Sequence, residues 1–369
     1  MAIHGLTLSV SLDHRPKKPR TSFFAPYSCD NFDMPVRMKD IAKDLGVSVV
    51  TVSKVLRNHS DISPATRMRV RQRMKELNYQ PNLAARALVT GRTSIIGLIV
   101  PDLVHPFFCQ VARGLSRVLR KKGYCLVISS SEEDPELERQ EIDQLLARRV
   151  DALIVASAQA GPESFRHIEE QKTPYILIDR RFERLKANFV GVDDEAMGRI
   201  ATQHLIGVGC KRIAHIGGPA VSTAIGRLRG FRSALKAAKI VVPDSYIIQR
   251  ERGDEASDAS GYDAMKKLLA LRPQPDGVFC YNDPTALGAM RAILEAGILI
   301  PRDIAVVGCG NVHYSDFLRV PLSSVDQDSE AIGDRAAKLA LSLVEAEGPM
   351  RTKTVLLEPK LVQRQSSSR

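Results

Sequence analysis

Residues 37–58 constrain the fold more than any other stretch, because their spacing predicts two short helices joined by a tight turn. Two helices that cross at a fixed angle need a small residue at their contact and a corner residue that tolerates a positive φ. Ala42 and Gly46 stand at those places. Ser48 can cap the second helix by accepting a backbone N–H hydrogen bond, so we expect that helix to begin at Val49. The pattern predicts a helix-turn-helix.

A helix-turn-helix that binds DNA inserts the N-terminal end of its second helix into the major groove. Val49 and Val50 suit thymine methyl groups there, and Lys54 is a long donor suited to guanine O6 and N7. The predicted phosphate contacts are hydroxyl side chains, those of Ser48, Thr51 and Ser53. An amphipathic helix pair packed inside a core explains the spacing of residues 37–58 equally well, so the segments that follow decide between the two interpretations.

Ser63 and Pro64 provide a cap and a first-turn proline for a third helix. Val70, Met74 and Leu77 have the spacing of its buried face. Its other face is basic and carries Arg67, Arg69, Arg71, Arg73 and Lys75. A run of charges is usually a solvated face, but this one adjoins the predicted recognition helix, which favours DNA binding.

A short fourth helix is expected next, with Asn82 as its cap and Gly91 just beyond its end. Ala84 and Ala87 are small enough to let two copies of this helix approach closely. Leu88 would then project as an apolar wedge that opens a base step in the minor groove. The predicted minor-groove residues are Asn82, Ala85 and Leu88. The alternative is that Leu88 is an ordinary core residue.

Charge is concentrated in this N-terminal region. Residues 35–92 hold 12 Lys and Arg against four Asp and Glu, so they carry +8 of the chain's net charge of +11. A basic head on a nearly neutral body is the electrostatic pattern of a phosphate-binding domain.

The remaining chain alternates short apolar runs with helical stretches, which is typical of parallel strands joined by crossover helices. A chain of this length predicts two α/β subdomains rather than one core. The expected strands are residues 95–100, 124–129, 152–156, 175–178, 212–216, 277–280 and 304–307.

From about residue 35 to the C-terminus the chain resembles the LacI/GalR family of bacterial transcription repressors. Three stretches carry the resemblance: KDIAKDLGVSVVTVSKVL, YQPNLAARAL and TSIIGLIVPD. The resemblance implies base reading by Val49, Val50 and Lys54 and intercalation by Leu88. It also implies a homodimer, with a tetramer left open, on a pseudo-palindromic operator that usually has a central C-G step.

The resemblance further implies the fold class: an all-α helix-turn-helix domain and an α/β periplasmic-binding-protein-like core of two doubly wound lobes joined by three crossovers. Mapped onto this chain, the domains are 1–34 (a disordered extension or a misassigned start), 35–81 (helix-turn-helix), 82–93 (hinge helix and linker) and 94–369 (core). The N-lobe would comprise 94–192 and 327–352, and the C-lobe 193–326 and 353–369.

Ligands of doubly wound sheets bind beyond the carboxyl ends of strands. Asp179 and Asn282 follow expected strands, and Arg227 lies in the stretch AIGRLRGF. The resemblance implies that these three residues hydrogen-bond a small effector, although Arg227 could equally be an exposed arginine near a helix start. Phe107 and Phe108 fit an apolar wall of the pocket or the core. Asp283, which precedes Pro284, is expected to cap a helix.

The sequence departs from the family pattern at Gly310, where many members carry a carboxylate that grips a sugar hydroxyl. Ser329 stands near the place of an aromatic ring in several members, and the chain has no Trp. A standard monosaccharide pocket is therefore not expected. Either the effector is another small molecule to which Asn311 or His313 contributes, or this chain has lost ligand control.

The six cysteines lack Cys-x-x-Cys pairs and resemble cytosolic thiols rather than a disulfide framework or a zinc site. They are Cys29, Cys109, Cys125, Cys210, Cys280 and Cys309. The eight histidines form no metal-binding pattern, so no metal or cofactor is expected.

No apolar run approaches the ~20 residues that a membrane span requires. Residues 1–34 have the wrong order of apolar and basic residues for a secretory signal, and we expect translation to start at Met34.

Two other classes of function compete with that of a regulator. A nucleotide-binding enzyme would need a G-x-G-x-x-G or Walker loop, and neither is present; Gly217-Gly218-Pro219 is too short to cradle a pyrophosphate. A transporter's solute-binding protein would share the core fold but needs a signal peptide and has no use for a helix-turn-helix. The sequence therefore predicts a cytoplasmic, non-enzymatic transcription repressor that binds operator DNA and a small-molecule effector.

Overall fold

The computed structural model describes residues 36–250, 257–348 and 350–369, without the side chains of residues 83, 84 and 257. The chain divides into two units, Met1–Asn82 and Leu83–Arg369. Each unit is described by itself. The expectations for residues 1–34, including Cys29 and the start at Met34, lie outside the described residues, as does the expectation for the Ala84 side chain.

The first unit is a bundle of three helices: α1 (Met38–Leu45), α2 (Val49–Leu56) and α3 (Pro64–Glu76). A small core formed by Ile41, Ala42, Val52, Val55 and Val70 holds them together. Gly46 has a φ of 63°, the left-handed conformation expected at the corner. The Ser48 hydroxyl accepts a hydrogen bond from the Thr51 N–H at 3.0 Å, and α2 begins at Val49 as predicted. The helix-turn-helix is therefore confirmed.

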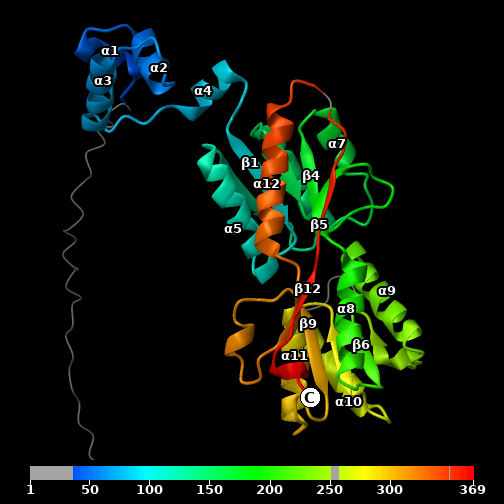
Figure 1. Ribbon diagram of the computed structural model, residues 1–369. Coiled ribbons are helices and arrows are strands. Elements are labelled where there is room, and N and C mark those ends of the chain that lie inside the picture. The colour runs from blue at the N-terminus through cyan, green and yellow to red at the C-terminus, as the bar shows by residue number, and fades with distance from the viewer. Residues whose placement is uncertain (1–35, 251–256, 349) are drawn as a thin grey trace, which may run out of the picture. The chain divides into compact units, whose positions relative to one another are not determined.

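The second unit begins with α4 (Leu83–Thr90) and contains two six-stranded sheets (Figure 1). The sheet of the N-lobe has the order β11-β5-β4-β3-β1-β2 and is parallel throughout. Its strands are β1 (Ile95–Val100), β2 (Cys125–Ser130), β3 (Ala152–Val155), β4 (Tyr175–Ile178), β5 (Asn188–Val192) and β11 (Thr354–Leu357).

The sheet of the C-lobe has the order β12-β10-β9-β8-β6-β7, and only the pairing of β10 with β12 is antiparallel among those described. Its strands are β6 (Ile213–Ile216), β7 (Ile247–Ile248), β8 (Gly277–Cys280), β9 (Ala305–Cys309), β10 (Ser323–Asp326) and β12 (Lys360–Val362). Three short 3₁₀ helices, Asp244–Tyr246, Ser315–Phe317 and Gln365–Ser367, accompany this lobe.

Helices cover both faces of each sheet, so each lobe contains two hydrophobic cores. In the N-lobe, α5 (Pro106–Lys121) and α12 (Ser329–Glu345) pack on one face, side by side in Figure 1, and α6 (Pro135–Ala147) and α7 (Phe165–Glu170) on the other. In the C-lobe, α10 (Ser257–Ala270) and α11 (Asp283–Glu295) face α8 (Asp194–Gly207) and α9 (Ser222–Ala237) across the sheet. The two lobes are doubly wound, as predicted.

The chain passes between the lobes three times: from β5 to α8, from β10 to α12, and from β11 to β12. The last passage differs from the expected boundary, which assigned residues 353–369 to the C-lobe. β11 extends the N-lobe sheet by parallel pairing with β5. Its side chains alternate between exposed and half-buried, as expected of an edge strand, so the sequence offered no continuous apolar run to reveal it.

Candidate functional site

The N-terminal end of α2 presents apolar side chains to solvent. Val49 and Val50 are exposed, Val50 to 60%, whereas Val52 and Val55 of the same helix are buried in the core. Ser48 and its capping hydrogen bond fix this end of the helix. The two valines predicted to contact thymine methyl groups are therefore accessible to a partner at the start of the helix.

Lys54 lies further along α2 and forms an ion pair with Asp61. Both side chains are substantially exposed, so the pair contributes little to stability and can exchange for another partner. Of the predicted phosphate contacts, Ser48 and Thr51 also hydrogen-bond to each other through their hydroxyl groups at 2.9 Å. Thr51 and Ser53 are half-buried.

The basic face of α3 is largely engaged within the first unit. Arg73 forms an ion pair with Asp44 at 2.6 Å. The guanidinium groups of Arg67 and Arg71 donate to Asn58 Oδ1 at 2.5 and 3.3 Å. These interactions connect α3 with α1 and with the residues just after α2. The feature that the sequence suggested as a DNA surface therefore also holds the bundle together.

Leu88 on α4 is 83% exposed, and its neighbour Val89 is exposed as well. The alternative that Leu88 is a core residue is therefore wrong within this chain. Asn82 and Ala85, the other two predicted minor-groove residues, are also exposed, while Ala87 is half-buried. Gly91 ends the helix with a φ of 69°, as predicted.

A cleft of about 620 Å³ lies within the second unit, where the carboxyl ends of strands from both lobes meet. The N-lobe contributes the loop after β1, the loop after β2 and the residues after β4. The C-lobe contributes α9, the residues after β8 and the last residue of β9. The polar and aromatic side chains that matter for its chemistry are Asp102, His105, Phe107, Phe108, Glu132, Glu133, Asp179, Arg180, Arg227, Arg250, Tyr281, Asn282 and Gln327.

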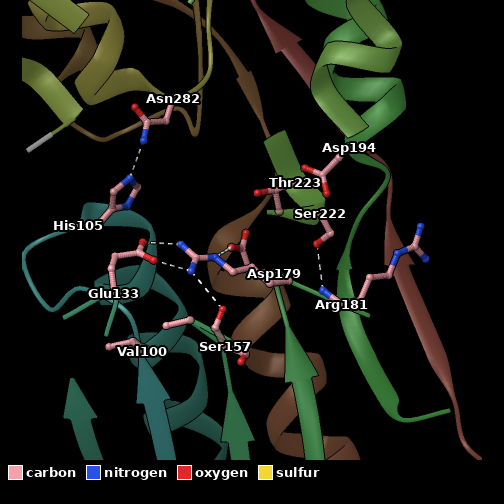
Figure 2. Close-up of polar contacts among 12 residues, drawn as sticks. Val100, His105, Glu133, Ser157, Asp179, Arg181, Asp194, Ser222, Thr223 and Asn282 are labelled. Atoms are coloured by element: carbon pink, nitrogen blue, oxygen red, sulfur yellow. Dashed lines mark hydrogen bonds and ion pairs between the residues drawn. The ribbon is translucent and has the colours of Figure 1, made fainter. Parts of the chain in front are cut away.

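Arg180 lies in the N-lobe wall of the cleft, and Figure 2 labels its partners Glu133 and Ser157 and its neighbour Asp179. Its guanidinium donates two hydrogen bonds to Glu133, at 2.6 and 2.8 Å, and one to the Ser157 carbonyl at 3.1 Å. Asp179 lies beside it, with its carboxylate 3.7 Å from Arg180 Nε. The Arg180 charge is therefore neutralised by residues of its own lobe.

Arg227 lies in the C-lobe wall of the cleft and likewise binds a carboxylate and a backbone carbonyl. It donates to Asp194 at 3.0 Å and to the Tyr281 carbonyl at 2.7 Å, and it lies over the Tyr281 ring at 4.8 Å. Only 3% of the residue is exposed, so the alternative of a solvent-exposed arginine is wrong. Burial raises the pKa of the Asp194 carboxyl to about 7, although Arg227 opposes the shift. Burial also raises the pKa of Asp179.

Comparison with known proteins places both units in one family. Residues 37–82 match the model "Bacterial regulatory proteins, lacI family", and residues 202–367 match "Periplasmic binding protein-like domain". The HTH-type transcriptional repressor PurR of Histophilus somni is 33% identical over 331 residues, which cover 89% of this chain and 98% of the relative. The ribose operon repressor of Escherichia coli K12 is 32% identical over 338 residues, covering 89% and 99%.

The chain belongs to the LacI family of bacterial regulatory proteins. Solved structures of LacI-family regulators have the same fold as this chain. A Lac repressor dimer bound to operator and the anti-inducer ONPF has a TM-score of 0.80 at 28% identity, covering 90% of this chain and 99% of that one. The regulator CelR in complex with cellobiose has a TM-score of 0.68 at 30% identity, with the same coverage. This chain is thus a DNA-binding transcription regulator of the family.

Five of the six effector-site residues predicted for this LacI-family member line the cleft: Phe107, Phe108, Asp179, Arg227 and Asn282. Asn311 does not. Its side chain donates to Asp326 at 3.0 Å and accepts from Arg364 at 2.8 Å. The backbone turns sharply before it, with a φ of 126° at Gly310 and 50° at Asn311, so Cys309 is the last residue of this strand to face the cleft.

The expected helix cap was assigned one residue too late. Asn282 caps α11 by accepting the Thr285 N–H at 2.8 Å. Asp283 is fully buried and instead accepts hydrogen bonds from the Val312 N–H at 2.8 Å and the Ser324 hydroxyl at 2.6 Å. It therefore connects the loop after β9 with strand β10. Burial raises the pKa of this carboxyl to about 6.

Residues from the stretch 102–108 after the first strand also line the cleft, as their position at a strand end suggests, but Glu133, Arg180, Tyr281 and Gln327 were not predicted. Arg180 directly follows Asp179, and Tyr281 directly precedes Asn282. Their position at the ends of strands could therefore have revealed them. Glu133 and Gln327 lie in connections without an apolar strand signal of their own. Two residues named as departures or alternatives, Ser329 and His313, are absent from the lining of this cleft.

Free cysteines, metal-binding groups and membrane-spanning helices can be assessed for the described residues. The cysteines placed by the structure, Cys109, Cys125, Cys210, Cys280 and Cys309, are all free thiols. Within the same residues no group of three or more His, Cys, Asp and Glu could hold a metal ion. Among the helices described, none combines the length and the apolar character needed to cross a bilayer.

Proposed function

We propose that this protein is a homodimeric repressor that binds a pseudo-palindromic operator and whose affinity for it is set by a small molecule in the interlobe cleft. The observation that carries the proposal is the combination, in one chain, of an exposed helix start at Val49 and Val50, an exposed Leu88 and a polar cleft between two lobes. Relatives at about a third identity over nearly their whole length are repressors.

The DNA contacts follow from exposure and position. Val49, Val50 and Lys54 would read base edges, and Ser48, Thr51 and Ser53 would contact phosphates. Asn82, Ala85 and Leu88 would lie in the minor groove, where Leu88 opens a base step. One recognition helix reads one half-site, so two copies of the chain are needed for a two-fold symmetric operator.

The charges of the cleft point to an uncharged, polar effector. Its lining has four carboxylates, Asp102, Glu132, Glu133 and Asp179, against the three arginines Arg180, Arg227 and Arg250. Arg180 and Arg227 already bind carboxylates of the protein. A phosphate or a multiply charged acid would thus meet no excess of positive charge. The volume of about 620 Å³ suits a small molecule that bonds through hydroxyl, carbonyl or amide groups.

Contacts between the lobes supply a route for control. The Arg181 N–H, from the segment after β4, donates to the Ser222 hydroxyl at the start of α9 at 3.0 Å (Figure 2). An effector that prefers one arrangement of the lobes shifts the protein toward it, whereas equal affinity for both would shift nothing. In this proposal the lobe arrangement determines whether the two Leu88 helices can pair on DNA.

A regulator of this kind has no catalytic step and works in the cytoplasm, where the chromosome is. The relatives are named as repressors rather than enzymes, which supports this part of the proposal. The sugar complexes of family structures, with cellobiose and with ribose, make neutral sugars the first compounds to test.

The experiment is operator binding by fluorescence anisotropy, using sites selected from genomic fragments and a panel of neutral sugars, nucleosides and purine bases. We expect one compound class to change the operator dissociation constant at least tenfold. An operator-binding protein that ignores every compound would refute effector control. A protein that binds no fragment preferentially would refute the repressor assignment.

A further inference from the structure

Asp61 is an acidic residue beside the side chain that is proposed to read guanine. It lies in the connection between α2 and α3, where its carboxylate accepts a hydrogen bond from the Lys54 ammonium and forms an ion pair with it. Val50 and Lys54 are four residues apart on α2, so they share one face of the helix. A carboxylate bound to Lys54 therefore adjoins the face that carries the exposed Val50.

The neighbours of Asp61 in the sequence fix the place of this carboxylate. Ile62 packs against the core of the first unit. Ser63 caps α3 by accepting a hydrogen bond from the Thr66 N–H at 3.2 Å. Asp61 directly precedes these two anchored residues, so its backbone is held beside α2. The Lys54 ammonium, in contrast, ends a flexible four-carbon stem, and the ion pair restrains it.

The ion pair changes what Lys54 offers to a DNA partner. An ammonium group has three N–H donors, and the contact with Asp61 uses one of them. Two donors remain, and the major-groove edge of guanine has two acceptors, O6 and N7. The carboxylate also offsets the charge of the ammonium. Lys54 thus keeps its directional donors, while its general attraction to phosphates weakens.

The electrostatics and exposure of the two groups agree with this arrangement. The hydrogen bond from Lys54 lowers the pKa of the Asp61 carboxyl below its ordinary value of 3.8, although desolvation opposes the shift. The carboxylate is therefore charged at neutral pH. The Lys54 side chain is 35% exposed and that of Asp61 52% exposed, so a base edge can reach the pair.

We propose that Asp61 is a positioning residue that restrains the Lys54 ammonium for guanine and so sharpens base discrimination in each half-site. A lysine without this partner could turn to phosphates or to single acceptors such as thymine O4, which would stabilise binding to the wrong sequences. Specificity is a difference between affinities, and a restraint that removes the alternatives increases it. The inference rests on the proposed function and deepens it, because it assigns a residue outside α2 to base reading by Lys54.

Discrimination is measured with the full-length protein on its selected operator and on operators substituted at the base pair where Lys54→Ala relaxes the preference. Fluorescence anisotropy gives the dissociation constants for the unsubstituted protein, Asp61→Ala, Lys54→Ala and the double variant. We expect Asp61→Ala to tighten binding to the substituted operators and to lower the discrimination ratio about threefold, an effect of the size that exposed ion pairs have. A ratio unchanged by Asp61→Ala would overturn the proposal.

The double variant separates positioning from direct reading of a base by Asp61. If Asp61 acts through Lys54, Asp61→Ala should leave the ratio unchanged in the Lys54→Ala background. A carboxylate can also accept a hydrogen bond from cytosine N4. An Asp61 that reads cytosine itself would still change the base preference without Lys54, and that result would overturn the positioning role.

Asp44→Ala is the matched control for charge. It also removes an exposed carboxylate from an ion pair of the first unit, because Asp44 binds Arg73 at 2.6 Å. The lost negative charge should tighten binding to all DNA alike and leave the discrimination ratio intact. A fall in the ratio as large as that of Asp61→Ala would make net charge, rather than the contact with Lys54, responsible, and the proposal would be wrong.

The ion pair itself is tested without DNA through the titration of Asp61 in the full-length protein. The carboxyl ¹³C resonance is followed after selective aspartate labelling and assigned with Asp61→Ala. Lys54→Ala should raise the pKa of Asp61, because the hydrogen bond that lowers it is lost. An unchanged pKa would show that the two side chains do not pair in solution, which removes the restraint.

These outcomes distinguish the positioning role from the proposed function. If Lys54→Ala relaxes the preference at one base pair but Asp61→Ala changes no ratio, base reading by Lys54 stands and positioning by Asp61 fails. If Lys54→Ala weakens binding uniformly, Lys54 does not read a base, and the positioning role fails with that assignment. A protein that prefers no DNA sequence refutes the repressor itself.

Discussion

The DNA-binding unit and the effector cleft differ in how their residues reach their places. In the first unit, the residues assigned to the major groove and its phosphates belong to one short helix and its cap Ser48, and they are exposed or half-buried. In the cleft, buried side chains depend on distant partners: Arg180 on Glu133, 47 residues away, and Arg227 on Gln327, 100 residues away. Substitutions in the cleft should therefore cost stability, whereas those in the DNA-binding residues should cost affinity alone.

Arg227→Ala should have the largest effect and tests the cleft side of the comparison. It leaves the buried Asp194 carboxylate without its cation, which typically costs about 3–5 kcal/mol of the free energy of unfolding. Urea unfolding followed by circular dichroism measures the loss. Arg229→Ala, in the same helix but with a side chain 63% exposed and 3.8 Å from Glu183, should change it by less than about 0.5 kcal/mol. A loss below about 1 kcal/mol for Arg227→Ala would refute a structural role for the pair.

Leu88→Ala should leave folding unchanged and weaken specific operator binding by about 3 kcal/mol, because the wedge that opens a base step is lost. Anisotropy titrations on operator and on unrelated DNA measure the two affinities. Val241→Ala removes a side chain that is also highly exposed and should change neither. Equal losses on both kinds of DNA would reject the wedge.

Lys54→Ala should cost about 1–3 kcal/mol on the preferred sequence and relax the preference at one base pair of each half-site. Affinities for a set of operators with single substitutions measure this. Lys75→Ala, at the end of α3, is the control and should leave the base preference intact. If Lys54→Ala weakens binding uniformly across sequences, Lys54 contacts a phosphate instead.

The last prediction concerns pH and returns to the cleft. Burial raises the folded-state pKa of Asp194 to about 7, above its ordinary value of 3.8, so the folded protein holds this proton more tightly than the unfolded chain. The free energy of unfolding should thus fall as pH rises from about 4 to about 7, by up to about 4 kcal/mol for a shift of this size.

Asp194→Asn should remove that fall, because the amide does not titrate. Asp143→Asn, at an exposed position of α6, should leave it in place. Urea unfolding at a series of pH values distinguishes them, and an unchanged slope in Asp194→Asn would show that Asp194 stays ionised throughout.

The same contrast explains how far the sequence could predict the structure. Caps at Ser48 and Ser63, the corner at Gly46 and the buried strands β1, β4 and β8 were predicted to the residue, because local patterns determine them. The edge strand β11 was assigned to the wrong lobe, because its alternating side chains resemble a loop.

The cleft was predicted only in part, for a related reason. Strand-end position revealed Asp179 and Asn282, and the family resemblance added Arg227. Asn311 was misplaced because the backbone has positive φ values at Gly310 and Asn311, and its side chain hydrogen-bonds to Asp326 and Arg364. The hydrogen bond between Asn282 and His105 in the cleft spans 177 residues, and no local pattern encodes it.

Selection of bound sequences from a randomised DNA library, with the purified full-length protein, tests the central claim most directly. The account predicts a two-fold symmetric motif whose half-sites change in one base pair with Lys54→Ala and whose enrichment falls with Leu88→Ala. Recovery of no motif, or of an asymmetric motif indifferent to both substitutions, would contradict it.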